Sequence, residues 1–465
     1  ASNEVKYVPF SELNALVVQK LNDHSVYTIG SISFLKIFEH ALTYAALKNN
    51  KKLIANHLRK PLWYQQLRAR LKYWKNAGPN RQTPLKRIVF IDPVRLTTDA
   101  EGQKRSIYMD RIINEIPRQQ SSIIQKKRQP EVVSDYTLSD FARVYPKMYD
   151  QEKMVLQSLQ TAYSNATKAG SFTAYELEHI ESALFIFWED FRFYFQMFHG
   201  QPVEQVVFIC HYHNEGMLAA CRLLEIKTVE LQHGLIAAND LYYVYDQQFA
   251  AIMPLALFPD QLWVYGPYWK RVVERGCEFQ PSQVQVAGDY LSRKPATAVA
   301  RLEKENMILV CAQKLMHEDY LAYLERLARY VAEYPDWRVV VKMHPLEPRK
   351  ELYQAIRQWG FELVDMEYTL DELLQRARIQ ISIYSTTFFD AIGFDVVNYA
   401  LQNYGNYQDY AADIIKESVA FPLTIDQNPI TLYLENKETH YAMERTEIYS
   451  PMDAALICGL LAKGR

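Results

Sequence analysis

The chain has 465 residues, of which 49% are hydrophobic, and its formal net charge is −2 because 54 Asp and Glu nearly balance 52 Lys and Arg. This length exceeds what one hydrophobic core usually supports, so we expect two domains of roughly 200 residues each. The balanced charge creates no long-range field that would capture a polyanion, which argues against a nucleic-acid-binding function.

Cysteine usage predicts a reducing compartment. The five cysteines are odd in number and widely separated, and no pair has the close spacing of a zinc site. His211 and His213 alternate along one expected strand end, and we favour a structural or hydrogen-bonding role for them over metal binding. We therefore expect no metal ion and no bound cofactor.

The sequence also predicts a soluble, cytoplasmic protein. No signal peptide is recognisable, and no uncharged apolar run reaches the roughly 18 residues that a membrane span requires. Residues 185–198 are crowded with aromatic side chains. A helix buried on most sides is the favoured interpretation, and the alternative is a surface for a lipid-linked acceptor or for peripheral association with the inner membrane.

In chain order, helical periodicity appears first, as at residues 33–42, where apolar positions recur three and four apart. A strand is expected at residues 87–91, where Asp92-Pro93 ends the pattern. The polar stretch 97–105 is interpreted as an exposed loop and residues 119–130 as a solvated connector. Helices are then expected to dominate residues 138–198.

The pattern changes after residue 202, where short apolar runs alternate with helical segments. Strands are expected at 206–210 and 228–231, on either side of a helix at 215–224. Two more strands, at 261–265 and 284–287, flank a helix at 267–275 that begins with proline. This succession is typical of a parallel sheet.

The second half repeats this alternation and predicts a doubly wound sheet, with a domain boundary near residue 295. The fold class is therefore α/β with two Rossmann-like domains, at residues 1–295 and 296–465. The expected strands of the second domain are 307–311, 337–342, 361–364 and 379–383, and its expected helices are 319–334, 350–359, 370–377 and 387–392.

The first candidate motif is Lys342-Met343-His344-Pro345. A lysine and a histidine two apart on a strand point to the same side, and Pro345 ends the hydrogen bonding so that the chain turns into a loop. Two nitrogen donors would then lie at the strand end. The alternative is a histidine that only caps a neighbouring helix.

The second motif, residues 382–387, supplies the hydroxyls of Ser382, Ser385, Thr386 and Thr387. If Thr387 opens a helix, unpaired backbone N–H groups and the helix dipole would favour an anion there. Asp390, one turn further on, is suited to accept hydrogen bonds from sugar hydroxyls. Ordinary Ser/Thr capping is the alternative.

The third motif is Gln232-His233-Gly234, which closes an expected strand of the first domain. His233 can act as a donor to a departing phosphate, and Gly234 allows a tight turn or a close approach of a ligand. A core histidine bonded to a carbonyl is the alternative. A two-domain arrangement would bring the His233 loop opposite the His344 and Ser385 loops.

These three motifs resemble those of GT-B bacterial surface-polysaccharide glycosyltransferases with an HP motif and a Ser/Thr motif, namely capsule polysialyltransferases, Kdo transferases and teichoic-acid polymerases. The resemblance covers about residues 203–395 and implies two domains facing across a cleft, with residues 1–295 binding the acceptor and residues 296–465 binding a CMP- or CDP-activated donor. It implies that Lys342 and His344 bind the donor phosphate, that Ser385, Thr386 and Thr387 bind phosphate or nucleotide, and that Asp390 binds the ribose.

Two departures from those families affect this interpretation. The polysialyltransferases carry a paired acidic motif before glycine, whereas this chain has Asn214-Glu215-Gly216. The polyol-phosphate polymerases have aspartate where this chain has Ile383. For the base that deprotonates the acceptor, we consider Glu215 first and Asp92 second.

Basic side chains near Asp92 complete the candidate set. Arg95, Arg105 and Arg111 would hold an acidic acceptor sugar or form solvated surface. The leading hypothesis is a metal-independent glycosyltransferase that moves a sugar, such as a CMP-activated ulosonic acid, to a surface glycan. The alternatives are a CDP-polyol phosphotransferase, a UDP-sugar 2-epimerase-like isomerase and a non-catalytic nucleotide- or glycan-binding protein.

Overall fold

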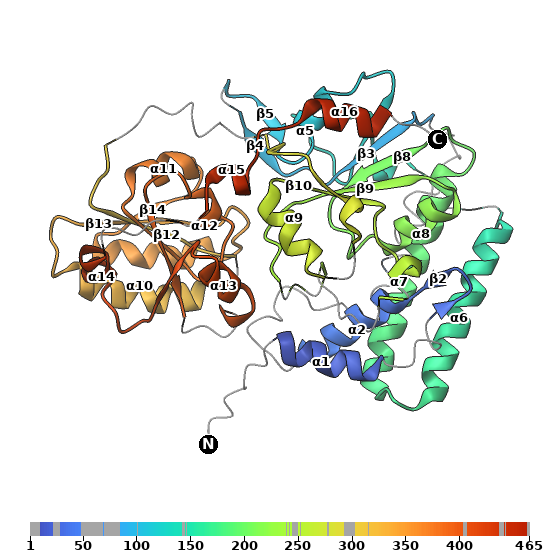
Figure 1. Cartoon of the computed structure of the whole chain (residues 1–465), viewed down its shortest axis with the longest axis horizontal. Coiled ribbons are helices and arrows are strands. Elements are labelled where there is room, and N and C mark those ends of the chain that lie inside the picture. The colour runs from blue at the N-terminus through green and yellow to red at the C-terminus, as the bar shows by residue number, and fades with distance from the viewer. Residues whose placement is uncertain are drawn as a thin grey trace. The chain divides into compact units, whose positions relative to one another are not determined.

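The computed structural model describes two compact units, and each is treated by itself (Figure 1). The N-terminal unit contains Phe10–His233, Leu241–Lys294 and Tyr449–Arg465, and the C-terminal unit contains Gly234–Asp240 and Pro295–Ile448. The described residues are 10–21, 28–47, 68, 84–99, 101–141, 145, 147–238, 240, 242–243, 250–251, 253–276, 279–292, 303–314, 316–402, 407–436, 441 and 443–462.

The N-terminal unit is built on a seven-stranded sheet in the order β11-β10-β9-β8-β3-β6-β7, with every neighbouring pair parallel. Its central strands are apolar and fully buried, as expected for a sheet covered on both faces. The strands are β3 (Ile88–Asp92), β6 (Ser121–Gln125), β7 (Tyr136–Thr137), β8 (Gln205–Phe208), β9 (Lys227–Leu231), β10 (Gln261–Val264) and β11 (Val284–Val286).

Helices α7 (Ala174–Phe198) and α8 (Glu215–Leu223) pack closely in this unit (Figure 1). Gly216 permits the contact, because a Cβ atom there would lie 2.5 Å from the backbone nitrogen of Phe191. The aromatic rings of α7 are largely buried, so the interpretation of residues 185–198 as a buried helix is confirmed.

The remaining elements of the N-terminal unit surround this core. Two short antiparallel ladders, β1–β2 and β4–β5, stand apart from the main sheet. The elements are α1 (Phe10–Lys20), β1 (Thr28–Ile29), β2 (Ile32–Ser33), α2 (Leu35–Leu47), β4 (Leu96–Thr98), β5 (Lys104–Ser106), α5 (Asp110–Asn114), η2 (Leu138–Asp140), α6 (Asp150–Ala169), η4 (Met253–Leu255), α9 (Pro267–Glu274), η5 (Pro281–Gln283) and α16 (Ala454–Ala462).

The C-terminal unit is built on a six-stranded parallel sheet in the order β14-β13-β12-β15-β16-β17. The strands are β12 (Met307–Cys311), β13 (Arg338–Lys342), β14 (Glu362–Val364), β15 (Ile379–Ser382), β16 (Val397–Leu401) and β17 (Phe421–Leu423). Its helices are α10 (His317–Val331), the 3-10 helix η7 (Lys350–Trp359), α11 (Leu370–Arg376), α12 (Thr387–Asp390), α13 (Tyr407–Lys416), α14 (Pro429–Glu435) and α15 (Arg445–Ile448).

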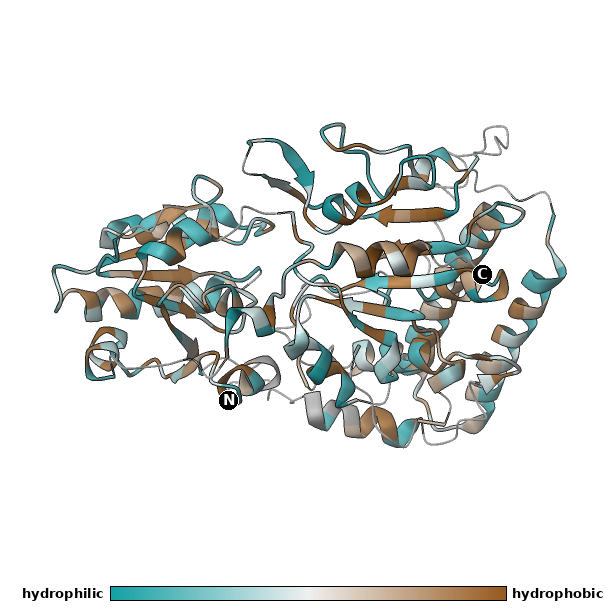
Figure 2. Ribbon diagram, turned by 45° about the horizontal axis from the view of Figure 1, so that its top comes forward, coloured by the Kyte–Doolittle hydropathy of each residue, from teal (hydrophilic) through white to brown (hydrophobic). Residues whose placement is uncertain are grey.

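Alternation along β12 assigns side chains to the two faces of this sheet. Ile308 and Val310 pack in a cluster with α10, η7 and α14, whereas Leu309 packs in a second cluster with α11. Because successive strand residues point to opposite faces, a continuous apolar strand serves both clusters. Figure 2 shows hydrophobic colour along strands of both sheets.

The α/β class and the two Rossmann-like sheets of the predicted GT-B fold are confirmed. Three local expectations were wrong. The expected loop at 97–105 has its two ends paired in the β4–β5 ladder, Thr97 with Arg105 and Thr98 with Lys104, and an Arg105–Asp99 ion pair closes the hairpin. The expected helix at 387–392 is the four-residue α12. The expected connector at 119–130 contains β6, which pairs along the whole of β3.

The last segment of the chain lies in the N-terminal unit, whereas the sequence led us to group all of 296–465 in one domain. The Arg87 guanidinium donates to the Leu461 carbonyl, and Asp289 and Asp453 each donate a backbone N–H to a carbonyl across the junction. Gly288 is required at this junction: its φ is +85°, and an added Cβ would contact the Pro451 carbonyl and lie 2.7 Å from the Met452 Cα. The backbone of Pro451 and Met452 therefore leaves no room for a side chain at position 288.

Each sheet has one topological switch point. In the N-terminal unit the chain leaves β3 first toward β6 and β7 and later toward β8 and β9, so the switch lies between β3 and β8. In the C-terminal unit it lies between β12 and β15. Open α/β sheets bind ligands outside the carboxyl ends of the strands at such points, so both are candidate sites.

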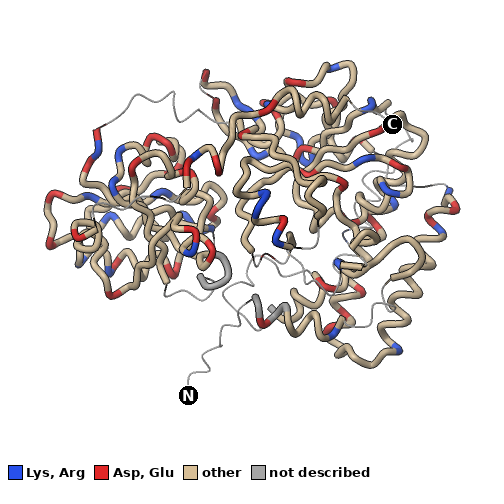
Figure 3. Tube along the Cα trace, in the orientation of Figure 1, with Lys and Arg blue, Asp and Glu red and all other residues tan. Residues whose placement is uncertain are grey.

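Two further properties concern the distribution of charge and the character of the helices. Figure 3 shows charges of both signs spread along the described part of each unit. Within the described residues, no helix combines the length and the apolar character needed to cross a membrane.

Candidate functional site

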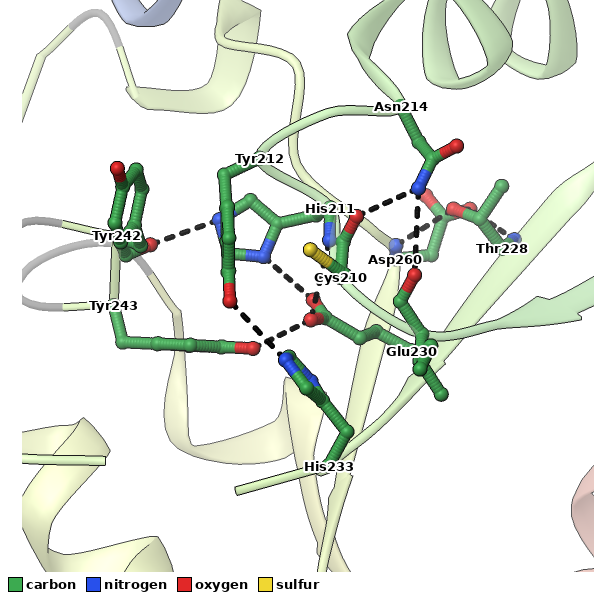
Figure 4. Close-up of polar contacts among 11 residues, drawn as sticks. Cys210, His211, Tyr212, Asn214, Thr228, Glu230, His233, Tyr242, Tyr243 and Asp260 are labelled. Atoms are coloured by element: carbon green, nitrogen blue, oxygen red, sulfur yellow. Dashed lines mark hydrogen bonds and ion pairs between the residues drawn. The ribbon is translucent and has the colours of Figure 1, made fainter. Parts of the chain in front are cut away.

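Polar side chains gather where β8 and β9 end, beside the switch point of the N-terminal unit (Figure 4). The parallel pairing of Phe208 with Glu230 sets the register that brings the loop after β8 next to the end of β9. This loop carries Cys210, His211 and Tyr212, and His233 follows β9. Two segments distant in sequence therefore form one cluster.

A buried carboxylate lies at the centre of this cluster. Glu230 Oε2 is 2.6 Å from His211 Nδ1, and Oε1 accepts a hydrogen bond of 2.6 Å from the Tyr243 hydroxyl and one of 3.2 Å from the His211 backbone N–H. Burial alone would raise the pKa of Glu230, but the charge and hydrogen bonds of His211 outweigh it and lower the pKa. Glu230 is therefore ionised.

The second ring nitrogen of His211 determines its charge. Nε2 lies 2.8 Å from the Tyr242 carbonyl oxygen, which can only accept, so Nε2 carries a proton. Nδ1 faces the ionised Glu230 and carries a proton as well. His211 is thus an imidazolium in a buried ion pair, which ties the segment around Tyr242 and Tyr243 to the ends of β8 and β9.

His233 lies beside this pair and makes different contacts. Its Nε2 is 3.1 Å from the Tyr212 hydroxyl, and its carbonyl accepts a hydrogen bond of 3.0 Å from the Tyr108 hydroxyl. Its Nδ1 is covered and has no hydrogen-bond partner among the described residues. Burial lowers the pKa of His233, and the negative charge of Glu230 only partly opposes this, so the ring is neutral at pH 7.

Glu215, the first residue of α8, is paired with His40 of α2 at 3.0 Å between Oε1 and Nδ1. Burial lowers the pKa of His40 to about 4, so the ring is neutral at pH 7 and donates its Nδ1 proton to the carboxylate. Burial raises the pKa of Glu215, but the hydrogen bond from His40 and nearby positive charge bring it to about 2. A carboxylate with this pKa is a weak proton acceptor near neutral pH.

Asp92 ends β3 in a fully buried position. Its Oδ1 accepts hydrogen bonds from the Val94 backbone N–H at 2.8 Å and from the Ser106 hydroxyl at 2.9 Å. Burial raises the pKa of Asp92, and these two bonds oppose the rise. The geometry is that of a carboxylate that closes a turn.

The three expected acceptor-binding arginines differ in what they contact. Arg95 is exposed and donates to the Tyr108 hydroxyl at 3.2 Å. Arg105 is engaged with Asp99 at 2.8 Å within its hairpin, and Arg111 donates to the Asp289 carbonyl. Of these three arginines, only Arg95 is connected to His233, because the Tyr108 hydroxyl that accepts from Arg95 donates to the His233 carbonyl.

In the C-terminal unit, Lys342 ends β13 and His344 follows it, as the sequence predicted. The Lys342 ammonium donates to the carbonyls of Asp365 and Tyr368 at 2.6 and 3.0 Å, and burial lowers its pKa. His344 Nδ1 accepts a hydrogen bond of 3.1 Å from the Leu346 backbone N–H, so the neutral ring carries its proton on Nε2. Pro345, between His344 and Leu346 in the loop, is exposed.

Ser382 ends β15 and is fully buried. Its hydroxyl donates to the Cys311 carbonyl at 2.8 Å and lies 3.0 Å from the Tyr320 hydroxyl. Gln313 joins this network by accepting the Tyr384 backbone N–H at 2.9 Å. These bonds connect the ends of β12 and β15 at the switch point.

The residues after Ser382 form a tight turn. The Ser385 hydroxyl accepts the Thr387 backbone N–H at 3.2 Å, and the Thr387 hydroxyl accepts from the Gln380 amide at 2.5 Å. Thr386 is the N-cap of α12, which is too short to contribute the dipole of a full helix. Asp390 is buried in the last position of α12, and its backbone carbonyl accepts from Arg445.

Gly234 follows His233 and has open space around its Cα atom: a Cβ built there would meet no atom within 4 Å. A close approach of a ligand at this residue stays a prediction. The same is true of the expected apposition of His233 with His344 and Ser385, which belong to the other unit.

Sequence reasoning missed the roles of Tyr212, Glu230 and His211 as one network. The signal was a charged residue, Glu230, between the apolar residues Val229 and Leu231 of an expected strand, since a carboxylate is buried only with partners. Hydrogen bonding was nevertheless the role favoured for His211. Within the described ranges, no group of three His, Cys, Asp or Glu side chains is arranged to hold a metal ion.

No family model and no curated protein matches this chain. Solved structures resemble it distantly. UDP-GlcNAc 2-epimerase from Neisseria meningitidis bound to UDP-GlcNAc is 13% identical, with a TM-score of 0.48, and the match covers 81% of this chain and 100% of that one. The wall teichoic acid polymerase TagF is 12% identical, with a TM-score of 0.43 over 86% of this chain and 97% of that one.

MurG from Acinetobacter baumannii is 11% identical, with a TM-score of 0.41, and the match covers 81% of this chain and 99% of that one. Identities and TM-scores this low carry no functional argument. The fold assignment of this chain therefore rests on its own strand order, with one parallel, doubly wound sheet in each unit.

Proposed function

We propose that this chain is a metal-independent GT-B glycosyltransferase that moves a sugar from a nucleotide donor to a glycan acceptor. The observation that carries the proposal is the pair of switch points: each parallel sheet has polar side chains at the carboxyl ends of its strands. In this proposal the C-terminal unit binds the donor and the N-terminal unit binds the acceptor.

His344 supports the donor role of the C-terminal unit. Because its Nδ1 accepts from Leu346, its ring proton lies on Nε2, and we assign this N–H as a donor to a phosphate oxygen. Ser385, Thr386 and Thr387 follow the neighbouring switch-point strand, and we assign them to the same phosphate or to the nucleotide. Since α12 is only four residues long, hydroxyl and amide donors, rather than a helix dipole, would hold this anion.

His233 is the base that the N-terminal unit supports best. It is neutral, and its Nδ1 has no partner among the described residues, whereas Glu215 holds its proton too weakly and Asp92 closes a turn. In the proposed step the acceptor oxygen forms a bond to the anomeric carbon while its proton moves to His233. The bond from that carbon to the donor phosphate breaks, and the nucleotide leaves with the negative charge.

We propose a CMP-activated ulosonic acid as the donor, following the resemblance of the HP and Ser/Thr motifs. Arg95 is exposed and linked through Tyr108 to His233, so it is suited to bind an acidic acceptor sugar beside the base. A lipid-linked acceptor would bring the chain to the membrane surface. The alternative of a UDP-sugar 2-epimerase-like isomerase would use UDP, so the test includes that nucleotide.

The test combines binding and transfer. Thermal shift with CMP, CDP, UDP and GDP identifies the nucleotide, and radiolabelled transfer from the matching sugar donor to glycan acceptors measures activity. His233→Gln should abolish transfer with nucleotide binding kept, and His344→Gln should weaken nucleotide binding. His199→Gln, at a ring that stacks on Tyr149 outside the site, is the matched control.

Two outcomes would contradict the proposal. Binding of no nucleotide would remove the donor site. Transfer that is unchanged in the folded His233→Gln variant would remove the base. A thermal shift with UDP alone, followed by conversion of UDP-GlcNAc without acceptor, would instead indicate an isomerase.

A further inference from the structure

We infer that Tyr212 is a positioning residue that fixes the tautomer of His233, so that Nε2 carries the ring proton and Nδ1 is left as the proton acceptor. The catalytic meaning of this inference rests on the function proposed above. The assignment of the proton itself does not, because it follows from the contacts around the two side chains.

An unusual backbone conformation places Tyr212. Cys210 follows β8 with φ = 68°, a left-handed conformation that side-chain-bearing residues rarely adopt. The Asn214 amide holds this turn by donating to the carbonyls of Ile209 and Cys210 at 3.3 and 2.7 Å. Backbone strain that is held by neighbouring bonds often lies at functional sites. Here the turn directs Tyr212 toward His233.

Two contacts hold the Tyr212 ring in place. It stacks on Tyr242 with ring centroids 4.0 Å apart, and its hydroxyl lies 3.1 Å from His233 Nε2. Tyr242 is in turn held by the imidazolium of His211, which donates to its carbonyl. The hydroxyl position is therefore set by the buried ion pair of His211 and Glu230 (Figure 4).

Counting protons assigns the direction of the bond. The side chain of Cys210 is a second hydrogen-bond partner of Tyr212, and burial raises the pKa of this thiol to about 12, so its sulfur stays protonated at neutral pH. If the Tyr212 hydroxyl donates to the Cys210 sulfur, its oxygen accepts the Nε2 proton of His233. Nδ1 then carries a lone pair, and the ring proton of His233 and the hydroxyl proton of Tyr212 each have an acceptor.

The opposite direction leaves one proton without an acceptor. If Tyr212 donated to Nε2, the proton of His233 would sit on Nδ1, which is covered and meets no acceptor among the described residues. Buried N–H groups without an acceptor are rarer than buried acceptors without a donor. The hydrogen bonds of the substrate-free chain thus favour the tautomer with the proton on Nε2.

This tautomer suits a base. On taking the acceptor proton at Nδ1, His233 becomes an imidazolium, and its Nε2–H strengthens the bond to the Tyr212 oxygen. The charge of Glu230 stabilises the imidazolium, whereas the positive charges of Arg95, Lys126 and His211 oppose it. Because Nδ1 is covered in the free chain, acceptor binding has to expose this side of the ring.

The experiment measures the tautomer directly. In protein labelled with ¹⁵N-histidine, the chemical shifts of the two ring nitrogens distinguish Nδ1–H from Nε2–H, and loss of signals in His233→Gln assigns the ring. We expect Nε2–H in the wild type and a mixture of both tautomers in Tyr212→Phe. Tyr136→Phe, which removes a remote hydroxyl that donates to the Pro84 carbonyl, should leave the His233 signals unchanged.

Transfer kinetics provide the second measurement. Tyr212→Phe should lower kcat by about 10²-fold, within the range of general-base catalysis, with KM little changed and the pH profile displaced. Cys210→Ser keeps an acceptor for the Tyr212 proton and should retain the wild-type tautomer. A wild-type ring protonated on Nδ1, or an unchanged tautomer in Tyr212→Phe, would overturn the inference. The expected tautomer with unimpaired transfer in His233→Gln would overturn only the proposed base.

Discussion

The buried pair of Glu230 and His211 gives the sharpest stability prediction. Glu230→Ala removes the acceptor of three hydrogen bonds from a fully buried site. The buried imidazolium then loses its counter-charge, and breaking one partner of a buried pair costs about 3–5 kcal/mol. We expect this loss in the free energy of unfolding of the N-terminal unit.

Glu230→Gln is the matched control because it keeps the shape of the side chain. The amide oxygen can still accept from Tyr243, and the amide N–H can donate to Nδ1 of a now neutral His211. The loss should therefore be smaller, about 1.5–3 kcal/mol, as for hydrogen bonds to a charged group.

The pH dependence of this difference follows from the sign of the pKa shift. The pKa of Glu230 is lowered in the folded chain, so its stabilisation is present above the pKa of an unfolded glutamate and is lost as the pH falls toward the lower folded value. The advantage of the wild type over Glu230→Gln should thus shrink below about pH 4.

Hydrogen exchange measured by mass spectrometry in increasing urea is the suitable assay, since it reports β8 and β9 separately from the other unit. Equal losses in the two variants, each below about 1 kcal/mol, would refute the buried ion pair. A wild-type advantage that grows on acidification would refute the sign of the pKa shift.

Three further predictions concern other sites. Gly288→Ala should lower the free energy of unfolding by about 2–4 kcal/mol, because φ is +85° and the new Cβ would contact the Pro451 carbonyl. Limited proteolysis should then cut the chain near α16. Wild-type stability should fall as the pH drops from about 6.5 toward about 4, the pKa of His40 in the folded chain, because the unfolded chain takes up the proton first. In His40→Gln, the urea midpoint of unfolding should depend less on pH across this range. Glu305→Gln, which breaks half-exposed pairs with Arg338 and Arg376, should lower the free energy of unfolding, measured by urea titration, by less than about 1 kcal/mol, and a larger loss would contradict weak surface pairing.

The apolar strands were predictable because a parallel sheet buried on both faces requires continuous hydrophobic runs, as in β12 and β13. β6 was not, because its sequence begins with two serines and ends with Gln125. Gln125 satisfies its amide within the following turn, at the carbonyls of Gln129 and Val132. Polar strand residues with such local partners cannot be recognised from hydropathy.

The candidate site was predictable in part. His233, Lys342 and His344 were found because they follow apolar strands, and the structure places each at the carboxyl end of a strand. The ion pair of His211 with Glu230 was not found, because it depends on the register between two strands. That register is a property of the folded sheet, and residue spacing along the chain does not reveal it.

The N-terminal unit is built from separate segments of the chain, and this affects how it folds during synthesis. Tyr449–Arg465 belongs to this unit but is translated after all of β12–β17. The ribosome therefore releases all seven strands of the first sheet long before Pro451 and Met452 can pack at Gly288 and before α16 can accept from Arg87. Until then the nascent sheet carries an uncovered patch, and holding chaperones or early folding of the second sheet would protect it from aggregation.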